Sequence, residues 1–265
     1  MNCRKVLAVT MFLLTPVLSA NAGVSPGVEK NTRVFLETLN SSGGTPLEQL
    51  SVEDARSVLV GAQQGAELPD ARVEERTITV DGESIDLVIV KPPGRQRGQL
   101  PVFMYFHGGG WVLGDFPTHE RLIRDLVVRS GAVAVYVDYT PSPEAQYPTA
   151  INQAFAATQW VAENGSEIGV DGSRLAVAGN SVGGNMAAVV SLKATQAGDP
   201  NIRFQLLLWP VTDANFENAS YQAFGQDHFL TTPMMRWFWD NYTTSPQERN
   251  EIFASPLRAT VEQLE

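Results

Sequence analysis

The sequence predicts an α/β fold in which a mostly parallel sheet is covered by helices on both faces. Four continuous apolar runs of strand length alternate with segments of helix length, and these runs are residues 101–106, 132–137, 174–179 and 204–209. Strands that are apolar on both faces and alternate with helices are typical of a parallel sheet buried between helix layers. A chain of 265 residues, 43% of them hydrophobic, can bury a core of that size.

Two helices are expected before the sheet. The first is amphipathic, ends at the breakers of SSGGTP (41–46), and carries its apolar side chains at Val34, Phe35, Leu36 and Leu39. The second begins at Ser51, because Ser-Val-Glu-Asp resembles a capped helix start. Its apolar face is predicted to comprise Val52, Ala55, Val58 and Leu59.

The sheet is expected to start with an antiparallel hairpin. Alternating apolar and polar residues in RTITV (76–80) and SIDLVIV (84–90) flank Asp81-Gly82, a dipeptide typical of a tight hairpin turn. The helices between the later strands are expected near residues 119–129, 150–164 and 181–196.

Residues 1–22 are predicted to be a secretory signal peptide. They combine a basic start at Arg4 and Lys5 with an apolar stretch and with small residues before a cleavage point after Ala22. The alternative, a membrane anchor, would need about 20 apolar residues to span the bilayer. The protein is therefore expected to be exported, either to the periplasm or out of the cell.

The composition excludes several function classes. The only cysteine, Cys3, lies in the predicted signal, so the mature chain is expected to have neither a disulfide nor a thiolate metal site. The net charge is −10, and no cluster of Lys and Arg forms a phosphate-binding stripe, so nucleic acid is not an expected partner. No segment after the signal is expected to span a membrane, no metal or cofactor is predicted, and the oligomeric state stays open.

One serine lies in a turn that suits a nucleophile. Gly179-Asn180-Ser181-Val182-Gly183 has the form G-x-S-x-G between a predicted strand and a predicted helix. Gly179 and Gly183 are expected to permit a turn so sharp that any side chain there would collide with neighbouring elements. Ser181 would then stand exposed at a helix N-terminus, where negative charge is favoured. Small residues also pack strand against helix in non-catalytic domains, so this motif alone leaves both interpretations open.

A glycine loop follows the strand at residues 101–106. It reads His107-Gly108-Gly109-Gly110-Trp111, at the place from which an oxyanion hole receives backbone N–H groups. Three glycines leave amides uncovered for a substrate carbonyl. The alternative is a flexible phosphate-binding loop, but no Lys or Ser/Thr follows in the required spacing and no acidic residue is placed for a ribose.

Four segments, in order and spacing, resemble the hormone-sensitive-lipase-like (GDXG-type) branch of the α/β-hydrolase esterases. They are HGGGWVLGDFPTH (107–119), VDYTPSPEAQYP (137–148), AGNSVGGN (178–185) and LLLWPVTD (206–213). The resemblance runs from about residue 47 to the last residue. It implies an α/β-hydrolase fold in which Ser181 is the nucleophile, the amides of Gly108, Gly109 and Val182 are the oxyanion donors, and His107 is structural.

The resemblance also implies a division of the chain. Residues 23–70 would be an N-terminal helical lid segment, and residues 71–265 would be the hydrolase core, incomplete at its C-terminus. Within the core, an insertion at about 214–245 would form a helical lid over the active site. The apolar stripe of that lid is expected at Met234, Trp237, Phe238 and Tyr242.

Three positions depart from the family pattern. Asn180 stands where the family usually has Asp, which removes a charge beside the nucleophile. Val182 replaces Ala and adds bulk beside the oxyanion hole, and Thr140 replaces an arginine. We expect these changes to affect substrate range and rate and to leave the fold intact.

The catalytic base is the missing part of the pattern. In this family the acid and the histidine follow the serine along the chain, and only His228 follows Ser181. His228 falls in the expected lid and lacks an acid in the expected arrangement, since Asp213 comes too early and Asp227 is adjacent. The resemblance implies that the acid and the base lie beyond residue 265, together with two strands that would cover residues 204–209. Without them those residues are expected to form an apolar edge and to make the chain poorly soluble.

The two leading functions come from different classes, and a third candidate is an acyltransferase that uses the same nucleophile and transfers the acyl group to an alcohol. The first is an exported serine carboxylesterase that cleaves small esters with short to medium acyl groups through an acyl-enzyme on Ser181. Without a base, Ser181 is an ordinary alcohol, so this chain is expected to show little or no activity. The second is a non-catalytic module that binds a small molecule on the same scaffold.

Overall fold

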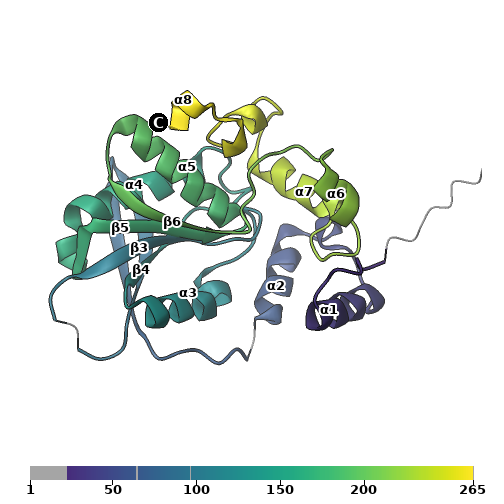
Figure 1. Ribbon diagram of the computed structural model, residues 1–265, viewed down its shortest axis with the longest axis horizontal. Coiled ribbons are helices and arrows are strands. Elements are labelled where there is room, and N and C mark those ends of the chain that lie inside the picture. The colour runs from purple at the N-terminus through teal and green to yellow at the C-terminus, as the bar shows by residue number, and fades with distance from the viewer. Residues whose placement is uncertain (1–22, 64, 96, 265) are drawn as a thin grey trace, which may run out of the picture.

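The computed structural model describes residues 23–63, 65–95 and 97–264. In these ranges six strands form one sheet, in the spatial order β1-β2-β4-β3-β5-β6 (Figure 1). Their bounds are β1 Arg72–Val80, β2 Glu83–Lys91, β3 Leu100–Phe106, β4 Val133–Asp138, β5 Val170–Asn180 and β6 Ile202–Leu208. Strands β4, β3, β5 and β6 run parallel, while β1 and β2 pair antiparallel. The predicted mostly parallel sheet is confirmed.

The antiparallel start of the sheet follows from its turn. Asp81 and Gly82 have φ angles of 52° and 87°, which is the combination that a two-residue hairpin turn needs to match the twist of its strands. Val80 pairs with Glu83 directly across this turn, and the register continues to Arg72 and Lys91. The predicted hairpin is confirmed.

Helices cover both faces of the sheet. Helix α3 (Phe116–Ser130) lies on one face, and α4 (Thr149–Asn164) and α5 (Val182–Ala197) lie on the other (Figure 1). The three predicted helices are confirmed, with small shifts in their bounds. Helix α3 begins earlier than predicted because Asp115 and Thr118 form a reciprocal capping box around Pro117, and it ends at Gly131 with φ 71°.

The sheet separates two apolar clusters. On the α3 face, Phe103, Tyr105 and Ala178 pack against Ile123 and Val127. On the other face the larger cluster fills the space under α4 and α5, and it reaches the residues after β3 and the later helix α7. Alternate residues of each central strand therefore point into different clusters, which explains why those strands are apolar throughout.

Four helices gather at one end of the molecule (Figure 1). They are α1 (Lys30–Ser41) and α2 (Val52–Ala62) from the N-terminal segment, and α6 (Ala219–Phe224) and α7 (Thr232–Tyr242) from the later segment. The ring centroids of Phe35 and Phe229 are 6.1 Å apart, and the Asn40 side chain donates to the carbonyl oxygen of Asp227. The two segments predicted as lid parts therefore touch each other. A last short helix, α8 (Val261–Leu264), contacts α5.

The first predicted helix is confirmed as α1, but most of its apolar residues are exposed. Of its four apolar residues only Leu36 is buried, while Val34 and Phe35 are 56% and 53% exposed. In α2, Val58 of the predicted apolar face is also exposed, although Ala55 of that face is fully buried. The other two residues of the predicted α2 face, Val52 and Leu59, are partly buried and pack against the core, so α2 buries most of that face while α1 buries only Leu36.

Strand β6 is an edge of the sheet. Among the described residues it pairs only with β5, and Phe204 is 62% exposed while Trp209, directly after the strand, is 68% exposed. The predicted apolar edge at residues 204–209 is confirmed.

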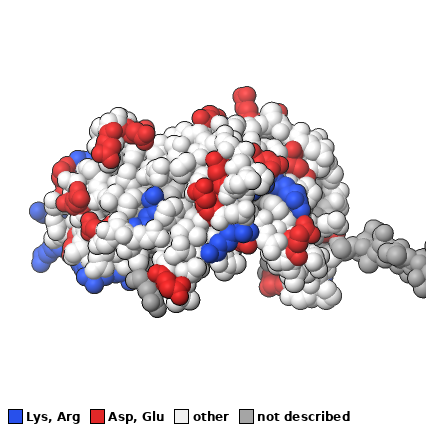
Figure 2. All heavy atoms as spheres, turned by 90° about the horizontal axis from the view of Figure 1, so that it is seen from above, with Lys and Arg blue, Asp and Glu red and all other residues white. Residues whose placement is uncertain are grey.

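Acidic and basic side chains are dispersed over the face seen in Figure 2, with broad uncharged areas between them. None of the helices described is long and apolar enough to cross a bilayer. The predicted signal peptide, Cys3 included, lies outside the described residues.

Candidate active site

Ser181 occupies a strained turn between β5 and α5. Its φ of 56° and ψ of −121° are a combination that residues with a side chain rarely adopt. The backbone is fixed from three sides, because the Ser181 N–H donates to Leu208 O at 2.9 Å and the Ser181 carbonyl accepts from Val211 N and Asn185 N at 3.1 Å each. These bonds hold the serine in a conformation that it would leave if free.

Two glycines make this turn possible. A Cβ atom at Gly183 would overlap the carbonyl oxygen of Phe106, and one at Gly179 would overlap the carbonyl oxygen of Gly183. The end of β3, the end of β5 and the start of α5 therefore approach more closely than any side chain permits.

The Ser181 hydroxyl makes no hydrogen bond to a described residue.

The glycine loop lies beside this turn because of the strand register. Phe106 pairs with Gly179 in the parallel β3–β5 ladder, so the loop after β3 and the turn after β5 leave the same edge of the sheet as neighbours. This edge, at the carboxyl ends of the strands, is where ligands bind in open α/β sheets. Two sequence motifs separated by about 70 residues are thus brought together by one pair of strands.

The loop itself is a tight turn. Gly109, Gly110 and Trp111 have φ angles of 115°, 66° and 61°. The Gly109 carbonyl accepts from the amides of Val112 and Leu113, and a Cβ atom at Gly109 would overlap the Leu113 carbonyl oxygen. The amides of Gly109 and Gly110 donate no hydrogen bond within the part of the chain that the structure describes.

The amide of Gly108 is already used. It donates to the Asn180 side-chain oxygen at 3.1 Å, and this oxygen also accepts from the Tyr105 hydroxyl at 2.8 Å. A Cβ atom at Gly108 would lie only 2.5 Å from the Asn180 side-chain nitrogen. Gly108 is thus packed and bonded against the residue that precedes the serine.

His107 is a buried and neutral ring. It stacks on Tyr139 with ring centroids 4.2 Å apart and planes 6° apart, and its Nδ1 donates to the Gly108 carbonyl over 2.8 Å. Burial, together with the nearby His119 ring, lowers the pKa of His107 to about 3. The His107 ring is therefore a structural support of the glycine loop, through its bond to the Gly108 carbonyl.

The other two histidines are engaged elsewhere. His119 Nε2 lies 3.4 Å from the Asn180 side-chain nitrogen, and burial lowers its pKa. His228 Nε2 accepts from the Ser25 N–H at 3.0 Å, and its Nδ1 donates to the Gln226 carbonyl at 2.6 Å. No histidine is hydrogen-bonded to Ser181.

Helix α7 lies over the glycine loop. The ring of Phe238 packs on Gly110, where a Cβ atom would overlap it, and the Tyr242 ring stacks on Trp111 at 3.9 Å. Phe238 and Tyr242 of the predicted stripe are buried, whereas Met234 and Trp237 are half-buried. The expected lid segment therefore contacts the expected oxyanion loop.

Two of the three departures from the family pattern have local partners. Thr140 exchanges two hydrogen bonds with Gln153, at 2.8 and 3.0 Å, so the replacement of arginine leaves no unsatisfied group there. Val182 is fully buried in the core. The third departure, Asn180, is the one that touches the loop.

Sequence reasoning missed Arg56. This side chain of α2 donates to the carbonyl oxygens of Val112 and Ser142, at 2.8 and 3.1 Å, and pairs with both oxygens of Glu144. It ties the end of the glycine loop to the N-terminal segment. The available signal is that Arg56 is the only basic residue of α2, and this does not indicate its partners.

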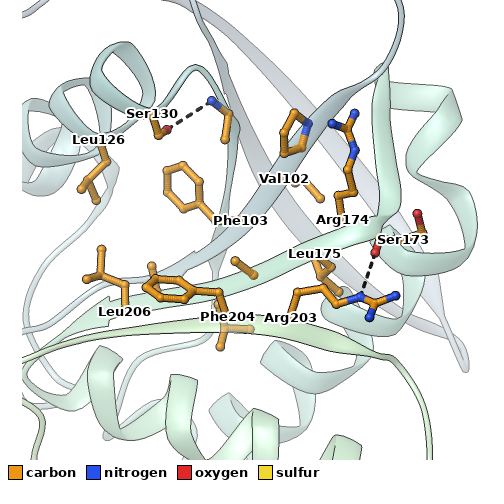
Figure 3. A pocket seen from close by; sticks show the side chains of 15 residues that line it. Val102, Phe103, Leu126, Ser130, Ser173, Arg174, Leu175, Arg203, Phe204 and Leu206 are labelled. Carbon is orange, nitrogen blue, oxygen red and sulfur yellow. Dashed lines mark hydrogen bonds between the residues drawn. The ribbon is translucent and has the colours of Figure 1, made fainter.

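An apolar groove of about 500 Å³ lies away from this site (Figure 3). It runs between α3 and the exposed face of β6, and is lined by Leu126, Phe103 and Phe204, with Arg174 and Arg203 at its rim. Its strand residues lie nearer the amino ends of the strands than Ser181 does, so the groove belongs to the uncovered sheet edge. Within the described residues no group of acidic, His or Cys side chains could hold a metal ion.

A family model described as the α/β hydrolase fold matches residues 103–265. The chain belongs to the α/β-hydrolase fold family. This α/β-hydrolase is 44% identical over 209 residues to carboxylesterase NlhH of Mycobacterium tuberculosis, a match that covers 78% of this chain and 63% of that protein. It is 31% identical over 224 residues to ethyl acetate hydrolase of Pseudomonas putida, which covers 82% of this chain and 70% of that one.

Solved structures agree with this assignment. A thermostable esterase from Pseudomonas putida ECU1011 superposes with a TM-score of 0.88 at 70% identity, covering 91% of this α/β-hydrolase and 76% of that chain. The esterase relatives confirm the predicted hormone-sensitive-lipase-like branch. The chain spans less than two thirds of the length of several curated relatives that it matches, 63% of NlhH and about half of others.

Proposed function

We propose that this α/β-hydrolase is a carboxylic ester hydrolase that cleaves small esters with short to medium acyl groups through an acyl-enzyme on Ser181. One observation carries the proposal: a serine held at φ 56° in the turn after β5 lies beside a glycine loop in which the Gly109 and Gly110 amides donate no hydrogen bond to a described residue. The printed names of the relatives, carboxylesterase and ethyl acetate hydrolase, support the substrate class.

In the proposed acylation, the Ser181 hydroxyl oxygen adds to the acyl carbon while its proton passes to a base. The carbonyl electron pair moves onto the acyl oxygen, and this oxyanion is stabilised by backbone N–H groups. When the intermediate collapses, the alcohol leaves with the proton that the base returns. Water then attacks the acyl-enzyme in the same way, releasing the carboxylic acid and restoring the serine.

The free amides favour a shifted set of oxyanion donors. Gly108, Gly109 and Val182 are the predicted donors, but the Gly108 amide is bonded to Asn180. The Gly110 amide makes no such bond within the described chain, and Val182 begins α5 at the helix end where N–H groups lack partners. We therefore propose that Gly109, Gly110 and Val182 supply the donors, and that Gly108 anchors the loop.

The base that would receive the Ser181 proton is not hydrogen-bonded to Ser181 among the described residues. Each of the three histidines has other partners, and none is bonded to Ser181. The prediction that the acid and the base follow residue 265 stays a prediction. It leads us to expect that the 265-residue chain by itself hydrolyses esters little faster than its Ser181→Ala variant.

Two further elements of the proposal concern substrate and location. The packing of Phe238 on Gly110 places an apolar ring against the loop, which supports an apolar acyl group. Export after cleavage near Ala22 is supported by the basic and apolar pattern of residues 1–22 and by a later sequence without cysteine.

The test is covalent labelling of Ser181 by a fluorophosphonate in the product of the complete coding sequence, with Ser181→Ala as the matched control. Labelling and hydrolysis of short-chain p-nitrophenyl esters that both disappear in Ser181→Ala support the hydrolase. An unlabelled serine in a folded protein that still binds the ester overturns it and favours the non-catalytic binding module. The module is retained as the second candidate because the Ser181 hydroxyl lacks a described partner.

A further inference from the structure

The side chain of Asn180 connects three elements behind the candidate site. Its oxygen accepts from the Tyr105 hydroxyl of β3 at 2.8 Å and from the Gly108 N–H of the glycine loop at 3.1 Å. Its nitrogen lies 3.4 Å from Nε2 of His119 in α3. No other side chain described here bonds to an amide of the three-glycine run.

These contacts fix the orientation of the amide. Two donors converge on one Asn180 atom, so that atom is the oxygen, and the atom that faces His119 is the NH2 group. His119 Nε2 must then be an acceptor without a proton. The ring proton lies on Nδ1, where the Thr118 hydroxyl oxygen at 3.0 Å and the Asp115 carbonyl at 3.3 Å can accept it.

We propose that Asn180 is a positioning residue of the oxyanion loop, which immobilises Gly108 through its side-chain oxygen and holds His119 in the neutral Nδ1–H tautomer through its NH2 group. The proposal deepens the proposed function, on which its catalytic consequence rests. It gives a reason for glycine at position 108, because a Cβ atom there would lie 2.5 Å from the Asn180 nitrogen.

The choice of an amide rather than a carboxylate matters electrostatically. Asp at position 180 could accept the same two bonds, but it would place a negative charge one residue from Ser181, where the oxyanion develops. It would also require a proton on His119 Nε2. The groups that face His119 are His107, Tyr105 and Asp115, and the His107 ring is 5.4 Å away. An uncharged His119 therefore suits this buried pair of imidazole rings.

The first test needs no substitution. Two-bond ¹H–¹⁵N correlation spectra of the imidazole rings report which nitrogen of His119 carries the proton. We expect the Nδ1–H tautomer in the wild-type chain at neutral pH, with slow exchange of the Gly108 amide. A proton on Nε2, or a Gly108 amide that exchanges as fast as an exposed loop amide, overturns the proposal.

Three variants separate the two roles of the side chain. Asn180→Leu keeps the number and branching of the side-chain heavy atoms and removes both interactions, so Gly108 exchange should accelerate at least about 10-fold and the His119 proton should no longer be confined to Nδ1. Asn180→Asp keeps the acceptor, so Gly108 protection should persist while Nε2 of His119 gains a proton. Asn164→Leu makes the same change at the end of α4, where the side chain bonds only locally to Trp160, and should alter neither readout.

Unchanged Gly108 exchange in Asn180→Leu would overturn the anchoring role, and an unprotonated Nε2 in Asn180→Asp would overturn the tautomer role. For the complete gene product we expect Asn180→Leu to lower kcat roughly 100-fold with little change in KM, and Asn180→Asp to lower kcat less, because it keeps the bond to Gly108 but adds a negative charge beside the oxyanion. Failure to label Ser181 in the wild type counts against the proposed function alone, since the spectra do not depend on activity.

Discussion

Ser181 keeps a costly backbone conformation because the surrounding residues leave no alternative. Conformations of this kind cost on the order of 1–3 kcal/mol and persist where the fold over-determines them. Here three backbone bonds hold the serine, and two glycines allow β3, β5 and α5 to converge on it. The sequence predicts the turn from its G-x-S-x-G pattern, but the atoms that enforce it come from Phe106, Leu208 and Val211.

Gly183→Ala is expected to destabilise the protein by at least about 2 kcal/mol, because the new methyl group meets the rigid backbone carbonyl of Phe106. The matched control is Gly61→Ala in α2, where nothing lies within 4 Å of the added Cβ. That change should stabilise the helix by about 0.5 kcal/mol. Chemical denaturation of both variants measures the difference, and equal midpoints would contradict the close approach of β3 and α5.

Acid should destabilise the folded chain through its buried histidines. The pKa of His107 is lowered to about 3, and that of His119 is lowered as well. An unfolded histidine titrates near pH 6.5, so between about pH 6.5 and 3 the unfolded chain binds more protons. The free energy of unfolding should then decrease as the pH is lowered through this range, by up to about 1.4 kcal/mol per pH unit for His107, and His119 adds a contribution of the same sign.

His107→Gln tests this origin of the pH dependence. The substitution removes one titrating ring. The slope of the unfolding free energy against pH, between about pH 6.5 and 5, should therefore decrease by up to about 1.4 kcal/mol per pH unit, which is the contribution of one proton. The variant is expected to be less stable overall, but the slope is the informative quantity. An unchanged slope in urea titrations at several pH values would show that His107 is not held neutral in the fold.

At the scale of the element, the spacing of apolar residues and the residue types of the turns predict most of the helices and strands. The hairpin at Asp81-Gly82 and the apolar runs of β3 to β6 are local signals, and they are confirmed within a few residues. The first predicted helix is confirmed as α1, but how much of its apolar group is buried depends on where the helix docks, and only Leu36 is buried. Its exposed Phe35 instead lies against Phe229, with the ring centroids 6.1 Å apart.

The β6 edge should drive self-association. Phe204→Lys places a charge on this exposed apolar edge and should reduce the oligomer fraction in sedimentation velocity runs over a concentration series. Val34→Lys on α1 introduces the same charge at a residue of similar exposure, and should leave the distribution unchanged. A wild-type chain that stays monomeric at every concentration would refute the prediction.

At the scale of the whole molecule, Arg56 links segments that are far apart in sequence. It joins α2 to the end of the glycine loop and to the loop at residues 142–144, and the guanidinium group satisfies carbonyl and carboxylate acceptors at the same time. The N-terminal segment is thereby fixed to the part of the core that carries the candidate site. Neither the spacing of apolar residues nor a short sequence motif predicts such a contact.

Arg56→Lys is expected to destabilise the protein by about 1–2 kcal/mol, since one ammonium group cannot serve three acceptors in fixed directions. Side chains at this site are partly exposed, so the ion pair with Glu144 should account for less than half of the loss. Arg129→Lys, at an 81% exposed side chain, is the control and should change stability by less than about 0.5 kcal/mol. Equal shifts of the melting temperature for both variants would contradict the stabilising role of the Arg56 hydrogen bonds.

The sequence by itself determined the fold class, the strands and helices, the hydrolase branch and the nucleophile candidate, because these depend on local periodicity and on motifs a few residues long. The tertiary structure decided the rest: the β3–β5 register that brings the glycine loop beside Ser181, and the Asn180 contact that occupies the Gly108 amide. It also decided that His107, His119 and His228 have other partners. Such pairings are set by packing between residues distant in the chain, and the pattern of any one segment does not contain them.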